Sequence, residues 1–265
     1  MADADLTAGT TVPERLADQP APPTPPSPGA APGGEKVMSL VDHLAELRTR
    51  LFRAILAVAL GSVVGWIFAP QLITFLRAPI GDRELIFLSP GEAFFVYLKI
   101  SVAVGIILAM PVILYQVWSF VAPGLTPSER RAVRPWVPLA LVFFALGVGV
   151  AYVILPFAMT FLLSFEVPGV TTATLTMDNY FGFVTTLFLA FGVTMEFPIL
   201  LFGLSRVGIL TSSRLKAWRR FVILGVAIFA AVVTPGGDPI SPLVLGVTMY
   251  TLFEGTVFVI ARTGH

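Results

Sequence analysis

Apolar runs long enough to cross a bilayer recur along the chain between Leu51 and Ala261. An α-helix rises 1.5 Å per residue, so about 20 apolar residues cross a hydrocarbon core of about 30 Å. One of these runs contains a carboxylate, Glu196. A charged side chain at mid-helix costs about 2.5–3.5 kcal/mol on insertion scales, and an acid kept at such a position is by default a functional candidate. The sequence therefore predicts a membrane protein and marks one residue inside it.

Six transmembrane helices account for the apolar runs, so we expect an all-α, polytopic membrane domain over residues 38–262. The fifth run is short, because thirteen residues rise only about 20 Å. No internal repeat is visible, which argues against a transporter built from inverted repeats. The expected spans cover residues 51–68, 93–120, 136–161, 180–204, 221–233 and 242–261.

Residues 1–37 differ in composition from the rest of the chain. They include the tract APPTPPSPGAAPGG, which has no hydrophobic periodicity and too few large apolar residues to form a core. A basic segment followed by a short apolar segment, as in a signal peptide, is missing from this region. We expect a disordered cytoplasmic tail.

The composition excludes several classes of protein. Charged residues make up only 12% of the chain, against about 25% in an ordinary soluble domain. The net charge is +1 and the basic residues are scattered, so nucleic acid is not an expected partner. There is no cysteine, and two histidines, His43 and His265, do not make a usual zinc site. No nucleophile motif or H-E-x-x-H motif occurs, so we expect a protein that is not an enzyme and has no catalytic residues, metal or cofactor.

The distribution of basic residues predicts the orientation in the membrane. If the N-terminus is cytoplasmic, the outer side receives only Arg77, Arg83 and Lys99. Lysine and arginine are enriched in cytoplasmic loops, so we expect both termini on the cytoplasmic side. The basic residues on that side cluster at positions 36, 48–53, 130–134, 206–220 and 262.

A leucine stripe precedes the first span in the segment SLVDHLAELRTRLF. The spacing over residues 40–51 predicts an amphipathic helix that lies at the cytoplasmic interface, with Ser39 as its N-cap. Glu46 belongs to the polar face of this helix. On pattern alone, it forms an ordinary i, i+4 ion pair with Arg50.

The loop after the second span contains the segment APGLTPSERRAVRPW. Pro127 opens a short helix with Glu129 in its first turn, where a carboxylate suits the helix dipole. Helix capping is therefore a sufficient structural explanation of Glu129. Arg130, Arg131 and Arg134 fit the bias of basic residues toward cytoplasmic loops.

Glu196 lies in the segment FGVTMEFPIL, ten residues before Arg206 and hence about 15 Å inside the expected boundary. Pro198 frees a backbone carbonyl and favours a kink. One interpretation is a protonated glutamate that hydrogen-bonds a neighbouring helix. The alternative is a residue that lines a functional cavity, as in a proton-coupled small-solute transporter.

Five segments resemble, in order, the TatC family, which is the multispanning receptor subunit of the twin-arginine protein translocase. They are HLAELRTRL, MPVILYQVWSFVAPGLTPSERR, FLAFGVTMEFPIL, VTPGGDPIS and MYTLFE, and the resemblance covers about residues 38–262. It implies six helices in a curved wall with a concave face. It also implies a receptor, not an enzyme, that binds twin-arginine signal peptides on the cytoplasmic face of the bacterial inner membrane. With TatA- and TatB-like single-span partners, in an oligomeric complex that contacts membrane lipid, such a receptor exports folded proteins by using the proton-motive force.

The resemblance also implies roles for individual residues. Glu46 and Glu129 match the acids that receive the arginine pair, and guanidinium groups pair bidentately with carboxylates. Glu196 matches the intramembrane glutamate of the family. Thr234 and Asp238 match a corner where single-span partners dock. The remaining signal-peptide positions are Arg48, Arg50, Phe120, Arg130 and Arg131.

Overall fold

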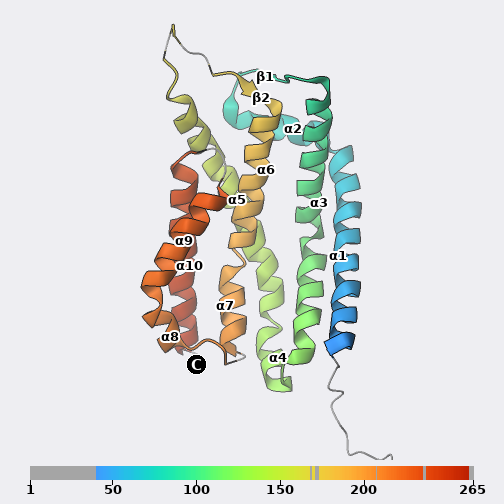
Figure 1. Cartoon of the computed structure of the whole chain (residues 1–265), viewed down its shortest axis with the longest axis vertical. Coiled ribbons are helices and arrows are strands. Elements are labelled where there is room, and N and C mark those ends of the chain that lie inside the picture. Colours follow the sequence, from blue (N-terminus) through green and yellow to red (C-terminus); the bar gives the residue numbers. More distant parts are fainter. Residues whose placement is uncertain (1–39, 168, 171–172, 207, 235–236, 263–265) are drawn as a thin grey trace, which may run out of the picture.

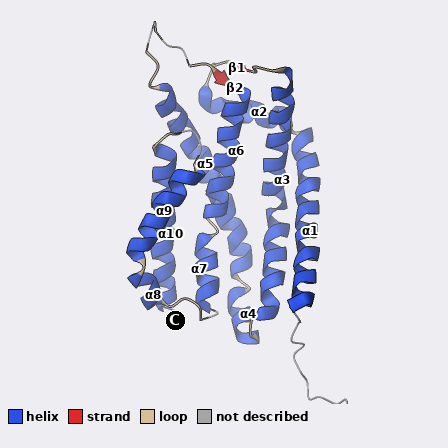
Figure 2. Ribbon diagram, in the orientation of Figure 1, coloured by secondary structure: helices blue, strands red, loops and turns tan. Residues whose placement is uncertain are grey.

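The computed structural model describes residues 40–262, apart from 168, 171–172, 207 and 235–236. Within this part the chain is almost entirely helical, and five helical segments are long and apolar enough to cross a membrane. Figure 2 shows the helices and the one short strand pair. The expected tail over residues 1–37 and the Ser39 cap lie outside the described residues.

Long helices occupy five of the expected spans. Four of them agree with the expected bounds to within three residues, whereas the helix that contains the first span begins at Leu40, eleven residues before the expected start. The fourth expected span is divided into two helices, α6 (Met177–Thr194) and α7 (Phe197–Arg206), and each of the others is one continuous helix. The helix that corresponds to the fifth expected span has only 15 residues and a length of about 22 Å, which is too short to cross an unperturbed bilayer. The count of six spans therefore stays a prediction at that helix. In chain order these helices are α1 (Leu40–Ile67), α3 (Pro90–Val121), α5 (Trp136–Leu163), α6 (Met177–Thr194), α7 (Phe197–Arg206), α9 (Arg219–Val233) and α10 (Ile240–Arg262).

The prediction of an amphipathic helix at the interface, before the first span, is wrong. Residues 40–67 form one continuous helix, α1, because no glycine or proline interrupts the chain between the leucine stripe and the first span. Leu44 and Leu51 are 65% and 57% exposed, so the stripe faces away from the protein.

Short elements connect the long helices. Strands β1 and β2 pair in parallel, with Leu85 opposite Leu175. The hydroxyl of Tyr180 in α6 donates a hydrogen bond of 2.6 Å to the carbonyl of Leu76 in α2, which fixes the connection after α1 against the bundle. The short elements are α2 (Ala69–Arg77), η2 (Ala78–Ile80), β1 (Leu85–Ile86), η3 (Ala122–Gly124), α4 (Pro127–Val133), β2 (Leu175–Thr176) and α8 (Ser212–Ala217).

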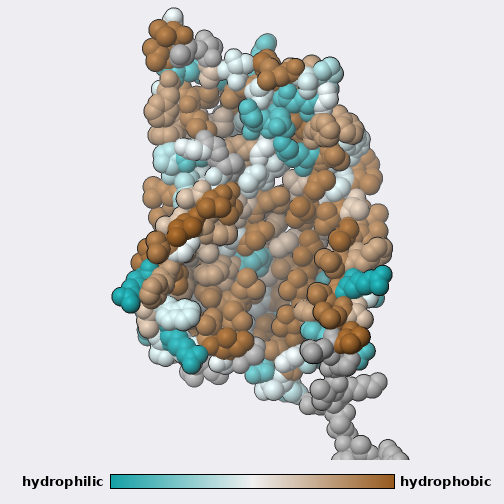
Figure 3. Space-filling model, viewed as in Figure 1, coloured by the Kyte–Doolittle hydropathy of each residue, from teal (hydrophilic) through white to brown (hydrophobic). Residues whose placement is uncertain are grey.

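The long helices form an open row and not a closed bundle (Figure 1). Helix α1 packs on α3, α3 on α6, α6 on α5, and α9 on α10. In Figure 3 the visible face is mostly hydrophobic between upper and lower groups of hydrophilic residues, and it is hollowed along its middle. This arrangement agrees with the curved wall that the family resemblance implies.

Two kinds of packing hold the row together. In the centre, buried aromatic side chains of α6, among them Tyr180, Phe181 and Phe191, pack against α3 and α5. Between α1 and α3 the contact is made by small residues instead. A Cβ atom on Gly105 would lie 2.2 Å from the Ser62 hydroxyl, so the two backbones touch in the manner of small-residue seams between membrane helices.

Candidate functional site

The two predicted acids, Glu46 and Glu129, lie at the same end of the molecule. Figure 1 shows the start of α1 and helix α4 together at the lower end. An aromatic contact joins α1 to α3 there, because the rings of His43 and Phe120 stack with centroids 4.3 Å apart and planes 16° from parallel. Phe120 is thereby held one helical turn from Glu46.

Glu46 uses only one of its carboxylate oxygens. Its Oε1 accepts hydrogen bonds from Nε of Arg50, at 2.9 Å, and from Nη2 of the same side chain, which confirms the predicted i, i+4 pair. Its Oε2 is buried and has no hydrogen-bond partner in the described part of the chain. Nδ1 of His43 lies 3.9 Å from Oε2, which is beyond hydrogen-bond distance. Glu46 therefore retains an acceptor that a further donor would satisfy.

Glu129 caps helix α4, as predicted. Its Oε2 accepts from the backbone N–H of Thr126 at 2.8 Å, and the Thr126 hydroxyl accepts in return from the backbone N–H of Glu129. The hydrogen bond from the Thr126 backbone, and after it the one with the Thr126 side chain, lowers the pKa of Glu129 below its usual range. Both bonds stabilise the ionised form. Helix α4 thus presents a carboxylate anion at neutral pH.

Not all of the arginines at this end contact Glu46 or Glu129. Arg50 pairs with Glu46, whereas Arg48 is exposed on α1. Arg130 and Arg131 line a groove of about 900 Å³ that Glu46 and Glu129 do not line. Of the four predicted arginines, the structure therefore brings only Arg50 into contact with a predicted acid.

Glu196 lies at the break between α6 and α7. The N–H of Glu196 bonds to the carbonyl of Val193, three residues back, and α7 begins at Phe197, so the predicted kink before Pro198 is confirmed. The side chain is 9% exposed, and its Oε1 has no hydrogen-bond partner among the described residues. The structure thus provides no support for a hydrogen bond from Glu196 to a neighbouring helix.

Thr234 and Asp238, the predicted docking corner, are both buried. Thr234 donates its hydroxyl to the carbonyl of Ala230 in its own helix. Asp238 Oδ1 accepts the backbone N–H of Ser241 at 2.6 Å and so caps the start of α10. These contacts give both side chains a local structural role, and partner docking there stays a prediction.

His43 is a residue of this site that the sequence analysis missed. As one of two histidines it gives no signal for a metal site, and its contact with Phe120 depends on how α1 packs on α3. The only available signal is its position three residues before Glu46, on the same helical face.

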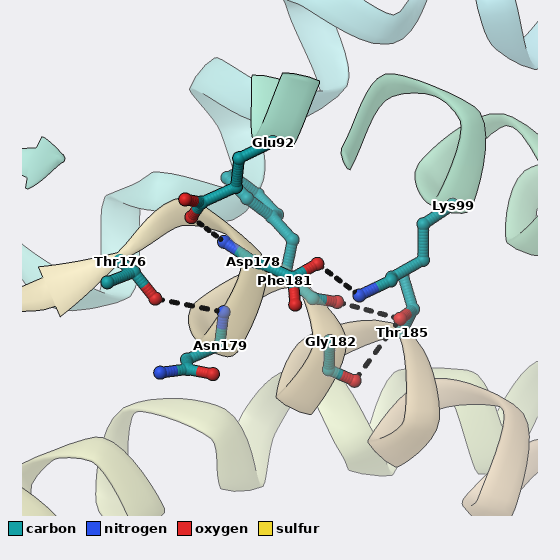
Figure 4. A network of polar contacts seen from close by, with 8 residues as sticks. All are labelled: Glu92, Lys99, Thr176, Asp178, Asn179, Phe181, Gly182 and Thr185. Carbon is teal, nitrogen blue, oxygen red and sulfur yellow. Dashed lines mark hydrogen bonds and ion pairs between the residues drawn. The ribbon is translucent and has the colours of Figure 1, made fainter. Parts of the chain in front are cut away.

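The opposite end of the molecule carries a network of charged residues (Figure 4). Nζ of Lys99 in α3 lies 2.6 Å from Oδ1 of Asp178 in α6. Glu92 Oε1 accepts the backbone N–H of Asp178 at 2.9 Å, and its Oε2 accepts the N–H of Leu88 at 2.7 Å. One carboxylate therefore ties the starts of α3 and α6 together.

A second contact at that end joins the loops before β1 and β2. Nη1 and Nη2 of Arg83 donate to Oε1 and Oε2 of Glu166 at 2.9 and 2.8 Å, and the N–H of Ala173 donates to Oε1 at 2.6 Å. The hydrogen bond from Arg83 and that from Ala173 lower the pKa of Glu166 from 4.5 to about 2. Glu166 is thus a fully paired anion in the folded state.

Known proteins resemble this chain over most of its length. The family model for the Sec-independent protein translocase protein TatC matches residues 42–247. The TatC protein of Synechocystis is 40% identical over 222 residues, which are 83% of this chain and 87% of the relative. The TatC protein of Aquifex aeolicus is 37% identical, over 83% of this chain and 94% of the relative. A chloroplast relative from Arabidopsis thaliana is 36% identical, over 87% and 68%.

Solved structures give the same answer. A crystal structure of the twin-arginine translocase receptor TatC superposes with a TM-score of 0.73 at 37% identity, and the match covers 82% of this chain and 99% of the other. A second TatC crystal structure has the same TM-score and identity, with 84% and 100% covered. The family match favours a translocase subunit over the small-solute transporter. This chain belongs to the TatC family.

Proposed function

We propose that this chain is the receptor subunit of a twin-arginine protein translocase. In this role it binds twin-arginine signal peptides on the cytoplasmic face. With TatA- and TatB-like single-span subunits, in an oligomeric complex, it exports folded proteins by using the proton-motive force and catalyses no reaction. The names of its relatives, which include the twin-arginine translocase receptor, support the proposal.

The observation that carries the proposal is the buried Oε2 of Glu46, which has no hydrogen-bond donor in the described part of the chain. A buried acceptor that lacks a donor loses its hydration without compensation, at a cost of about 1–3 kcal/mol. A guanidinium supplies two parallel N–H donors and stays charged at every physiological pH. Such a ligand gains most at an acceptor that the protein itself leaves unsatisfied.

The second arginine of the pair binds Glu129 in this proposal. Only Oε2 of Glu129 is used by the helix cap, so Oε1 remains available, and α4 lies at the same end as the start of α1. The stacked rings of His43 and Phe120 offer a flat surface beside Glu46 on which a guanidinium or an apolar peptide side chain packs. Arg50 holds the Glu46 side chain in place.

The orientation and the remaining partners belong to the same proposal. Both termini and the Glu46 end lie in the cytoplasm in this proposal, which the bias of basic residues supports, and the membrane is a bacterial inner membrane. The short helix α9 and the corner at Thr234 and Asp238 receive single-span partners. Glu196 serves as a polar anchor inside the membrane.

Peptide binding tests the proposal. We expect Glu46→Gln and Glu129→Gln each to weaken binding of an Arg-Arg signal peptide by about 5- to 150-fold, which corresponds to about 1–3 kcal/mol. Glutamine at position 129 still caps α4, so a loss there reports the charge and not the helix. Glu84→Gln, an exposed acid at the opposite end, is the matched control. A Lys-Lys peptide should bind the unaltered protein less well than Arg-Arg.

The measurement is a binding isotherm of a fluorescent signal peptide with the purified protein in detergent. Unchanged binding by both glutamine variants would show that the assignment to Glu46 and Glu129 is wrong. An equal loss in the Glu84→Gln protein would show that net charge, and not a site, governs binding.

A further inference from the structure

The groove beside the two acids has its own chemistry. It has a volume of about 900 Å³, and four arginines from three places in the chain are among its lining residues. Arg50 comes from α1, Arg130 and Arg131 from α4, and Arg134 from the residue after α4. Arg50, Arg130 and Arg131 match signal-peptide positions of the family, but recognition of an arginine pair by carboxylates does not explain why four arginines line one groove.

Most of this positive charge is not neutralised by the protein. Arg50 has Glu46 as its partner, but no carboxylate of the described residues lies within ion-pair distance of Arg130, Arg131 or Arg134. Cations held side by side repel one another unless an anion lies between them. The paired arginines of a signal peptide carry the same sign of charge, so they do not neutralise this groove.

The other wall of the groove is apolar and aromatic. Tyr115 and Trp118 from α3 face it together with Leu125 and Val137, and Tyr115 is 61% exposed. Tyrosine and tryptophan are enriched where the hydrocarbon core meets the headgroups. The groove therefore combines cations suited to phosphate with an apolar wall suited to acyl chains.

We propose that this groove binds the headgroup of an anionic phospholipid. The phosphate lies among Arg130, Arg131 and Arg134, and the start of an acyl chain lies along Tyr115 and Val137. Basic grooves between membrane helices on the cytoplasmic side have the charge and depth that such headgroups require. A free phosphate ion would use the arginines but leave the apolar wall bare. The inference does not depend on where the signal peptide binds.

Native mass spectrometry of the purified full chain tests the proposal by counting bound lipid. We expect phosphatidylglycerol to bind with an apparent Kd at least about tenfold lower than phosphatidylcholine. The combined variant Arg130→Gln, Arg131→Gln and Arg134→Gln should lose this preference. The control variant Arg214→Gln, Lys216→Gln and Arg220→Gln removes the same charge at the same end, outside the groove, and should keep it.

Three outcomes would overturn the proposal. They are equal binding of the two lipids, an equal loss of preference in the control variant, and displacement of phosphatidylglycerol by millimolar inorganic phosphate. If the combined variant does not fold, the single variant Arg134→Glu replaces it, because Arg134 is exposed. The same loss of lipid preference is expected, and an unchanged preference would contradict the proposal.

Discussion

The two ends of the molecule differ in how completely their charged side chains are paired. At the end with β1 and β2, Glu166 receives three hydrogen bonds and Glu92 receives two backbone N–H groups. At the end with α4, Glu46 keeps one buried oxygen without a donor, and three arginines face a groove without a carboxylate partner among the described residues. Charges that satisfy one another stabilise the fold, whereas charges left open are available to ligands.

This comparison depends on α1, which holds Glu46 and contacts the rest of the protein mainly through the seam with α3. A Cβ on Gly105 would lie 2.7 Å from the backbone N of Ser62 and 2.7 Å from the carbonyl of Val58, so the backbones must separate. We expect Gly105→Ala to cost about 3 kcal/mol and to abolish signal-peptide binding, as measured by thermal unfolding in detergent and by peptide isotherms.

Gly149→Ala is the matched control for Gly105→Ala, because a Cβ at Gly149 meets nothing within 4 Å. It should leave both readings unchanged. Normal peptide binding by the Gly105→Ala protein would show that the position of α1 on α3 does not matter for the receptor site.

Substitution of Glu92 tests the end with β1 and β2, where the charged side chains are paired and stabilise the fold. Glu92→Ala leaves the N–H groups of Leu88 and Asp178 without their acceptor, so we expect a loss of about 1–3 kcal/mol in unfolding free energy. Peptide affinity at the far end should not change. The two quantities are read from thermal melts and from peptide isotherms of the same preparation. Lowered peptide affinity at full stability would contradict the division between the ends.

The sequence predicted the long elements well because their signal is local. Apolar length alone predicted the long helices, and Pro198 alone predicted the break at Glu196. The capping role of Glu129 followed from Pro127, which opens the short helix and places Glu129 in its first turn. These features depend on neighbours within one or two helical turns.

Other features depend on how distant segments meet, so no local pattern indicates them. Strands β1 and β2 have two residues each and pair across about ninety positions. The contact of His43 with Phe120 requires α1 and α3 to lie in one particular register. The groove that Arg130 and Arg131 line together with Arg50 likewise appears only when α1, α3 and α4 are assembled.

Glu196 resembles Glu46 in having a buried oxygen for which the described residues supply no donor. If it serves as a neutral polar anchor, Glu196→Gln should keep most export activity and Glu196→Leu should lose about tenfold or more, because leucine has no hydrogen-bonding group. Export of a folded reporter measures both. An equal loss of export in the two variants would show that the ionisation of Glu196 is what export requires. Full export activity of the leucine variant would show that Glu196 has no role as a polar anchor.

The smallest expected effect is a pH dependence at the end with β1 and β2. The lowered pKa of Glu166, about 2 against 4.5, means that its stabilising contribution is complete above pH 4.5 and is lost as the pH falls toward 2. The difference in Tm between the unaltered protein and Glu166→Gln should therefore be constant from pH 7 to pH 5 and shrink below that. A constant difference down to pH 3 would show that Glu166 is not stabilised as an anion.

The central claim, that the open oxygen of Glu46 receives a peptide guanidinium, is tested most directly by a double-mutant cycle. Peptides with Arg-Arg, Lys-Arg and Arg-Lys are titrated against the unaltered protein, Glu46→Gln and Glu129→Gln. We predict that each acid couples by about 1 kcal/mol or more to one arginine of the pair and much less to the other. Coupling energies near zero for both acids would contradict the account.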